Sequence, residues 1–157
     1  LAVAEVVMAD IASEIPAAAD VPWQLVYQSR SGPPSQPWLE PDVVDVMEGL
    51  PEAGAKAVVI VPLGFVSDHM EVMWDLDTEA MEAAEEAGLR AVRTQTPGID
   101  PAYVRGLVDL IEERLKGTPA AERPHRTGLG PWFDVCRPGC CENVRAGFKP
   151  AASGIAP

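Results

Sequence analysis

The sequence has little positive charge, little cysteine and no long apolar run, and each shortage excludes a class of protein. Its 12 lysines and arginines stand against 24 aspartates and glutamates, which gives a formal net charge of −12 at pH 7. Because nucleic-acid phosphates require a basic surface, we expect no nucleic-acid partner. No apolar run reaches the roughly 18 residues of a membrane-spanning helix, so we expect no transmembrane segment.

The amino terminus lacks a start methionine, and it lacks the basic region followed by an apolar region that marks a signal peptide. We therefore expect a cytoplasmic protein and a chain that begins inside a structural element. Hydrophobic residues make up 47% of the 157 residues and charged residues 23%, which is typical of one globular domain with a real core.

Apolar periodicity and breaker residues divide the chain into alternating helices and strands. The expected order is helix 1–15, strand 23–28, helix 42–50, strand 57–63, helix 67–88, strand 89–93 and helix 100–116. This alternation predicts an α/β fold with a parallel sheet in three layers, over residues 1–116. The last helix is expected to bury one stripe: Tyr103, Leu107, Leu110, Ile111 and Leu115. After it we expect a linker at 117–130, a cysteine-bearing tail at 131–148 and a disordered end at 149–157.

The segment from Ser67 to Gly88 is the most informative part of the chain. Ser67 or Asp68 is a good N-cap, and Gly88 is a natural helix end. At about 100° per residue, one face of this helix is an acidic stripe of Asp68, Glu71, Asp75, Glu79, Glu82 and Glu86. The opposite face is apolar and is expected to pack on the molecule: Met70, Met73, Trp74, Met81 and Ala84. The stripe is either a solvated face or a ladder of oxygen ligands for a divalent cation.

The apolar run 57–63 is typical of a strand buried on both faces, and the acidic helix follows it by a few residues. The helix start therefore lies at the carboxyl edge of the sheet, where ligands bind in open α/β folds. Residues i and i+2 of a regular helix point about 200° apart, so His69 and Glu71 could not share a metal from within it. Either His69 lies in the loop before the first turn, or the helix is locally wide, as in a π-bulge.

Two separated motifs resemble the carboxyl-terminal half of the ferrochelatase family, over about residues 1–148. The first runs from Val61-Pro62-Leu63-Gly64-Phe65 through Ser67-Asp68-His69-Met70-Glu71 to Trp74-Asp75-Leu76-Asp77. The second is Tyr27-Gln28-Ser29-Arg30-Ser31-Gly32-Pro33, followed by Pro37-Trp38-Leu39-Glu40-Pro41. The resemblance implies a chelatase-like (Rossmann-like) lobe that inserts ferrous iron into a porphyrin during heme biosynthesis. The sequence looks like the high-GC Gram-positive branch, which implies coproporphyrin III as the substrate, with protoporphyrin IX as the alternative.

The resemblance also implies roles for individual residues. Glu71 would be the active-site carboxylate beside the porphyrin, with His69 orienting it and Asp68 capping the helix. Asp75 and Glu79 would continue a path for iron or protons. In the proline-rich loop, the porphyrin cleft or its wall would include Gln28, Ser29 and Arg30. The alternative for this loop is a rigid connection in which Arg30 pairs with a nearby carboxylate and Trp38 anchors the loop by burial.

All three cysteines, Cys136, Cys140 and Cys141, lie within six positions. Clustered cysteines without an export signal indicate metal or redox chemistry before structural disulfides. Some ferrochelatases carry a [2Fe–2S] cluster at this end, so the resemblance implies such a cluster, with a fourth ligand outside this chain. The alternatives are a zinc site that uses His125, and three reduced surface thiols.

One departure from the family is the absence of its second key histidine, since only His69 and His125 occur. We therefore expect this chain to be a fragment or one part of a split enzyme, with a missing amino-terminal lobe as its partner. Two other hypotheses remain: a chelatase for another metal and tetrapyrrole, and a non-enzymatic acidic metal-binding or regulatory module.

Overall fold

The computed structural model describes residues 1–30, 32, 33, 35 and 37–134. These residues divide into two compact units, of which the first runs from Val3 to Asp109 and the second starts at Leu110. The first unit contains the sheet and the helices packed on it, and the candidate site belongs to it.

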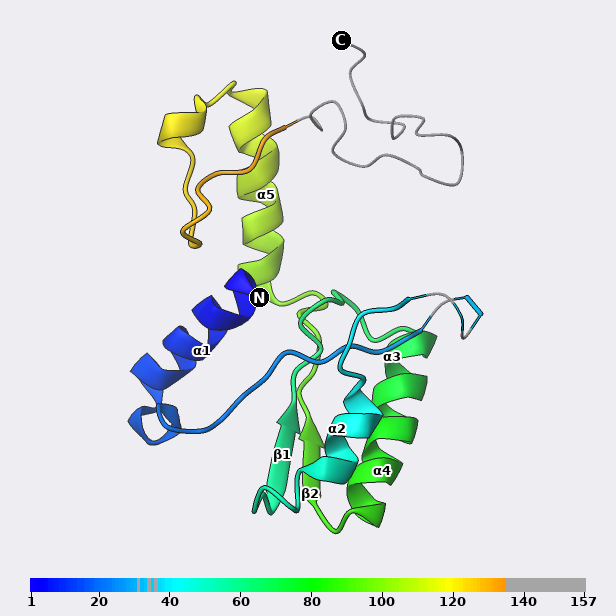
Figure 1. The fold of residues 1–157 in the computed structure, drawn as a ribbon. Helices are drawn as coiled ribbons and strands as arrows, with labels where there is room; N and C mark the ends of the chain where they lie inside the picture. Colours follow the sequence, from blue (N-terminus) through cyan, green and yellow to red (C-terminus); the bar gives the residue numbers. More distant parts are fainter. Residues whose placement is uncertain (31, 34, 36, 135–157) are drawn as a thin grey trace. The chain divides into compact units, whose positions relative to one another are not determined.

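Two parallel strands form the sheet of the first unit, β1 (Ala57–Ile60) and β2 (Arg90–Arg93). Their register pairs Ala57 with Arg90 and Ile60 with Arg93, so both strands end at the same edge (Figure 1). Both strands and their parallel pairing confirm the sequence prediction for this part of the chain. The connection between them is the acidic helix, as a parallel crossover requires.

The strand expected at 23–28 is not formed, and this prediction was wrong. Tyr27 makes only an isolated parallel bridge with Asp42. The backbone N–H of Tyr27 donates to the carbonyl of Pro41 at 2.9 Å, and its carbonyl accepts from Val43 N–H at 2.8 Å. The hydrogen bonds of this residue therefore hold the far end of the proline-rich loop, and none of them extends the sheet.

The short helix α2 (Val43–Gly49) starts at Asp42, whose side chain accepts a hydrogen bond from Val44 N–H at 2.8 Å. The acidic segment is a continuous run of α3 (Met70–Trp74), a π-helical turn η2 (Asp75–Ala80) and α4 (Met81–Glu86). It starts later than predicted, because the N-cap is His69 and not Ser67 or Asp68. It ends as predicted at Gly88, whose φ of 72° is accessible to glycine.

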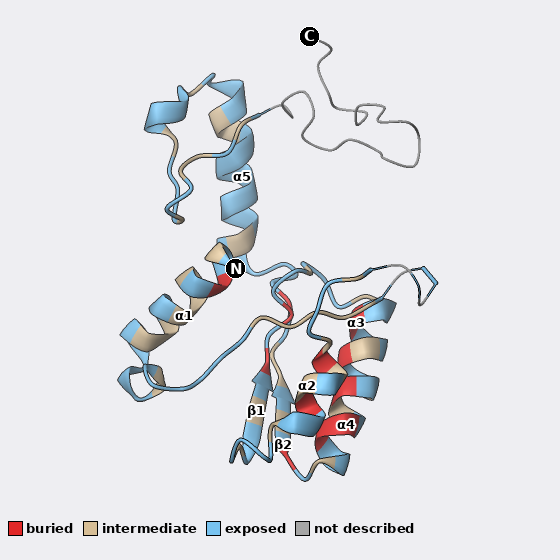
Figure 2. Cartoon of the chain, in the orientation of Figure 1, coloured by how far each residue is buried: buried red, intermediate tan, exposed pale blue. Residues whose placement is uncertain are grey.

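The core of the first unit lies where α4 and η2 pack against α2 and the sheet (Figure 2). The helix buries mainly small side chains there: Val72, Leu76, Ala80, Ala83 and Ala84. Of the face predicted to be buried, Met70, Met73 and Trp74 are instead 79, 49 and 57% exposed. The buried face of the helix is therefore a different one from the Met- and Trp-bearing face that the sequence suggested.

The other face of the sheet is open, which corrects the expectation of a strand buried on both sides. Val59 is 64% exposed and Val92 is 61% exposed. Among the described residues, the sheet therefore has a helical layer packed firmly on one face only. The expected α/β class is present, whereas the expected three-strand, three-layer lobe is not.

Two further helices agree with the predicted ranges, α1 (Ala2–Glu14) and α5 (Pro101–Leu115). Within α1 only Ala4 is buried. No residue of α5 is buried, so the stripe predicted from Tyr103 to Leu115 is wrong as a core face of this chain. Short 3₁₀ turns occur at Pro16–Ala18 and Ala120–Glu122. None of the described helices combines the length and the apolar character needed to span a membrane.

Candidate active site

The start of α3 places His69 outside the helix. Its backbone is extended, with φ −95° and ψ 175°, and its ring packs edge-on against Phe65 with ring centroids 4.8 Å apart. Glu71 lies in the first turn and its residue is exposed. This is the first of the two alternatives that the spacing of His69 and Glu71 required. Among the described residues no hydrogen bond joins these two side chains.

The second alternative, a wide turn, is also present, but one turn further along. The π-helical turn starts at Asp75 and therefore carries the acidic stripe through Glu79. π-helical turns are rare and frequently occur at functional sites. The wide turn contains one residue more than a regular α-helical turn. The faces of α4 are therefore rotated about the helix axis relative to those of α3. A stripe drawn at constant 100° spacing is therefore only approximate beyond Asp75.

The loop after residue 28 is joined to this turn by a polar cluster. The hydroxyl of Ser29 donates to Asp75 Oδ2, and the amide of Gln28 lies 3.1 Å from Ser29 Oγ and 3.5 Å from Asp75 Oδ2. Trp38 Nε1 donates to the carbonyl of Gln28 at 3.3 Å, which ties the two halves of the loop together. Ser29 has a φ of 62°, a left-handed conformation that is uncommon outside glycine.

A shallow hollow of about 270 Å³ lies between the loop, the start of α2 and the π-helical turn. Its lining residues are Gln28, Ser29, Arg30, Asp42, Val43, Val44, Trp74, Asp75 and Glu79. The fold therefore brings the three loop residues singled out in the sequence next to Asp75 and Glu79. Glu71 is not among the lining residues and stands one turn before them on the helix.

The three carboxylates of Glu71, Asp75 and Glu79 follow one another along the helix at intervals of four residues. In the part of the chain that the structure describes, no three His, Cys, Asp or Glu side chains converge as a metal-binding group. The arrangement is thus a line of separate oxygen donors. Such a line can pass a cation along a surface but does not form a closed cage around it.

Arg93 was not singled out from the sequence, although it makes the densest set of ion pairs at this edge. Its Nε and Nη2 donate to the two carboxylate oxygens of Asp77, the latter at 2.7 Å, and its Nη1 donates to Asp68 Oδ1 at 2.8 Å. Hydrogen bonding to the guanidinium lowers the pKa of Asp77 and raises the pKa of Arg93. Asp68 therefore binds Arg93 and does not cap the helix as expected. An arginine at the end of a strand beside an acidic helix was the available signal.

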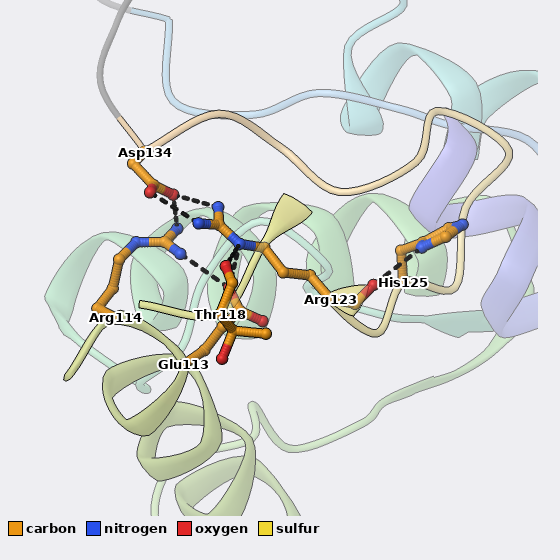
Figure 3. A network of polar contacts seen from close by, with 6 residues as sticks. All are labelled: Glu113, Arg114, Thr118, Arg123, His125 and Asp134. Atoms are coloured by element: carbon orange, nitrogen blue, oxygen red, sulfur yellow. Dashed lines mark hydrogen bonds and ion pairs between the residues drawn. The ribbon is translucent and has the colours of Figure 1, made fainter. Parts of the chain in front are cut away.

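In the second unit, Arg123 and Arg114 both bind the carboxylate of Asp134 (Figure 3). Arg123 also donates from Nε to the carbonyl of Thr118 at 2.9 Å. These contacts lower the pKa of Asp134, mainly through the hydrogen bond from Arg123. The segment predicted as a linker, 117–130, thus has fixed contacts of its own.

The ring Nδ1 of His125 lies 3.2 Å from the carbonyl oxygen of Arg123. His125 was the alternative zinc ligand for the cysteine-bearing tail. Cys136, Cys140 and Cys141 lie outside the described residues. The geometry of the expected cluster is therefore not described.

The sequence of this chain is similar to known proteins of one family. The ferrochelatase family model matches residues 2–115. The coproporphyrin III ferrochelatase of Leifsonia xyli subsp. xyli is 65% identical over 150 residues, which are 96% of this chain and 39% of that protein. The coproporphyrin III ferrochelatase of Tropheryma whipplei is 64% identical over 135 residues, or 86% of this chain and 34% of that protein. The ferrochelatase of Rhodopirellula baltica is 50% identical over 122 residues, or 77% of this chain and 34% of that protein.

The chain therefore spans between 34% and 39% of the length of these three relatives. The matched residues contain the sheet, the acidic helix and the loop that joins Asp75, so the resemblance includes every element of the candidate site. The family model alone spans more than half of the chain, and the chain belongs to the ferrochelatase family.

Proposed function

We propose that this chain forms the metal-handling lobe of a coproporphyrin III ferrochelatase and works with an amino-terminal lobe. The single observation that carries the proposal is the line of Glu71, Asp75 and Glu79 that starts at the carboxyl edge of the sheet and runs into the hollow beside Gln28 and Ser29. The relatives named coproporphyrin III ferrochelatase support the choice of substrate.

The reaction inserts Fe²⁺ into a free porphyrin. Two pyrrole N–H bonds break, four Fe–N bonds form, and two protons leave, with no change in the oxidation state of iron. A group beside the macrocycle must accept protons as the metal enters. Glu71 is exposed in the first helical turn and is able to take this role as a general base. His69 stands at the N-cap of the same helix, two residues before Glu71.

Asp75 and Glu79 are proposed to guide ferrous iron toward Glu71 or to carry protons away. Hard carboxylate oxygens bind divalent cations without changing their oxidation state. The hydroxyl of Ser29 and the amide of Gln28 fix the orientation of the Asp75 carboxylate, and Glu79 lines the same hollow. A line of singly bound donors releases the ion at each step, which a tight cage would prevent.

The amino-terminal lobe is proposed to supply the other wall of the porphyrin cleft and the second histidine. The aligned residues make up only 39% of the Leifsonia protein, so most of such an enzyme lies outside the matched segment. On α3, Met70 and Trp74 are 79 and 57% exposed beside Glu71, and they offer an apolar surface for a flat macrocycle or for that lobe.

We also propose a [2Fe–2S] cluster in the cysteine-bearing tail, and only the sequence supports it. Three cysteines within six positions provide three of the four thiolates that such a cluster takes. The iron of this cluster would be separate from the ferrous iron that is the substrate.

The test is a metallation assay with Fe²⁺ under anaerobic conditions, followed through the loss of free-porphyrin absorbance. We expect turnover when this chain is joined to the amino-terminal portion of the Leifsonia protein, and faster turnover with coproporphyrin III than with protoporphyrin IX. The 157 residues alone should be nearly inactive, because half a cleft does not hold the macrocycle against the metal donor. Metal binding without metallation by the joined protein would favour the non-enzymatic acidic module, and faster insertion of cobalt or nickel would favour a related chelatase.

A further inference from the structure

Arg93 contacts two points of the segment that carries the proposed chemistry, one before His69 and one within the π-helical turn. It is the last residue of β2 and lies at the same sheet edge as the start of α3. Its guanidinium uses two nitrogens on Asp77 and the third on Asp68 and on the carbonyl of Thr94, the last at 3.0 Å. Every nitrogen of the guanidinium therefore has a partner.

Both carboxylates that Arg93 holds lie within three residues of the proposed path. Asp68 directly precedes His69, and Asp77 lies two residues after Asp75 in the π-helical turn. One guanidinium thus fixes the chain just before the first site residue and again within the wide turn. Glu71 lies between the two fixed points.

Among the described residues, no side chain caps the start of α3, and its other contact is the packing of the His69 ring on Phe65. The Arg93 side chain is only 14% exposed, whereas those of Asp68 and Asp77 are 37 and 35% exposed. Exposed single ion pairs contribute little, but a bidentate arginine whose own charge is mostly shielded from solvent holds its partners in a defined geometry. A π-helical turn lacks some of the regular α-helical hydrogen bonds. The contact of Arg93 with Asp77 therefore helps to stabilise this turn.

We propose that Arg93 is a positioning residue that sets the orientation of Glu71 toward the porphyrin, an inference that rests on the proposed function. Arg93 touches neither substrate nor metal in this proposal. It acts through Asp68 and Asp77, and its removal leaves the helix start free to move relative to the sheet edge. A displacement of about 1 Å in a reacting group is enough to lower turnover by about 100-fold.

The test uses the joined two-lobe protein and compares Arg93→Gln with Arg90→Gln as the matched control. Arg90 lies on the same strand and is exposed, and among the described residues its side chain makes no ion pair. Arg93→Gln should lower kcat about tenfold or more with little change in KM for porphyrin, because orientation is lost and not binding. Arg93→Lys should recover only part of kcat, since one ammonium cannot hold both carboxylates as a guanidinium does. Arg90→Gln should match the wild type.

A double-mutant cycle separates positioning from a general structural role. Added to Glu71→Gln, the Arg93→Gln change should lower kcat by less than about twofold, because the group that Arg93 positions is already gone. An equal loss in both backgrounds would overturn the proposal in favour of a structural role, as would a wild-type kcat in Arg93→Gln. If Arg93→Gln does not fold, Asp77→Asn removes the bidentate contact and gives the same comparison. If the joined wild-type protein has no turnover, the proposed function itself is overturned. If it is active, the outcomes above test only the role of Arg93.

Discussion

The hydroxyl of Ser29 donates a hydrogen bond to the carboxylate of Asp75, which lies 46 residues later in the chain. This contact joins the loop after residue 28 to the first residue of the π-helical turn. Ser29 has a φ of 62°, and such conformations in residues other than glycine cluster at functional sites. The two motifs of the sequence therefore meet at one carboxylate.

Replacement of Ser29 separates the cost of the lost hydrogen bond from the cost of the backbone conformation. Ser29→Ala should lower the free energy of unfolding by about 1 kcal/mol, the usual contribution of one hydrogen bond. Ser29→Gly loses the same hydroxyl but adopts a positive φ without steric strain, so it should cost less. Urea denaturation of the joined protein measures both. Two variants as stable as the wild type would mean that the Ser29–Asp75 contact does not contribute to folding.

The pair of Asp77 and Arg93 predicts a specific loss of stability in acid. Hydrogen bonding to Arg93 lowers the pKa of Asp77 below its ordinary value of 3.8, so the folded protein binds this proton less tightly than the unfolded chain does. The contribution of the pair to the free energy of unfolding is therefore complete well above pH 3.8. It is lost as the pH falls from there through the lowered pKa of the folded state. Most carboxylates titrate in this range, so the informative quantity is the difference between proteins.

We expect Asp77→Asn to be less stable than the wild type at neutral pH and to approach it as the pH falls. Asn cannot bind a proton in this range, and its amide pairs with Arg93 more weakly than a carboxylate does. Denaturant unfolding at a series of pH values between about 6 and 2 measures this difference above and below the ordinary pKa of Asp. A difference that stays constant with pH would contradict the assignment of the lowered pKa to this pair.

Local sequence signals predicted much of the first unit correctly. The apolar run at β1, the glycine at residue 88 and the proline at the start of α5 each act on their immediate neighbours, and each element is present. The spacing of His69 and Glu71 limited the helix start to two geometries, and His69 lies in the loop that one of them required. The Ser29–Asp75 contact was outside the reach of local patterns, although the two motifs pointed to the same edge.

Most of the failed predictions, and the missed role of Arg93, depend on contacts between distant parts of the chain. Met70 and Trp74 were expected inside because they lie on the apolar face, but the helix buries Val72, Leu76 and three alanines instead. Arg93 has two carboxylate partners, Asp68 and Asp77, 25 and 16 residues away, and no spacing rule selects them among the many acidic residues. The strand expected near Trp23 needed a neighbouring strand to pair with, and its end is instead bound to the start of α2.

The cysteine-bearing tail gives a prediction that depends on metal content. If Cys136, Cys140 and Cys141 bind a [2Fe–2S] cluster, the joined protein purified without oxygen should be coloured and should contain about two irons per chain. Replacement of any one of them with Ser should remove the colour and lower the melting temperature, because metal binding is coupled to folding. Iron analysis and absorbance spectra measure this. A colourless, iron-free and equally stable protein would exclude the cluster, and bound zinc would favour the alternative site.

The line of carboxylates along the acidic helix predicts a gradient of effects on turnover. In the joined protein, Glu71→Gln keeps the size of the side chain but removes its charge and its ability to accept a proton. Turnover should fall by about 100-fold or more, the usual scale for the loss of an acid–base group. Asp75→Asn should cost less, because this residue stands one turn further along and Glu79 lines the same hollow. Steady-state metallation rates with coproporphyrin III and Fe²⁺ measure each variant.

Glu82 and Glu86 are the matched controls for this series. Both are exposed on α4, beyond the π-helical turn, and neither lines the hollow, so their replacement with Gln should leave turnover nearly unchanged. The melting temperature should change little in the Glu71, Glu82 and Glu86 variants, because each substitution removes a negative charge from a helix face that already carries several. A graded loss from Glu71 to Asp75 with unchanged controls requires a path that starts at the sheet edge. Equal and small effects at every position would mean that the stripe is a solvated face, and Glu71 would then have no catalytic role.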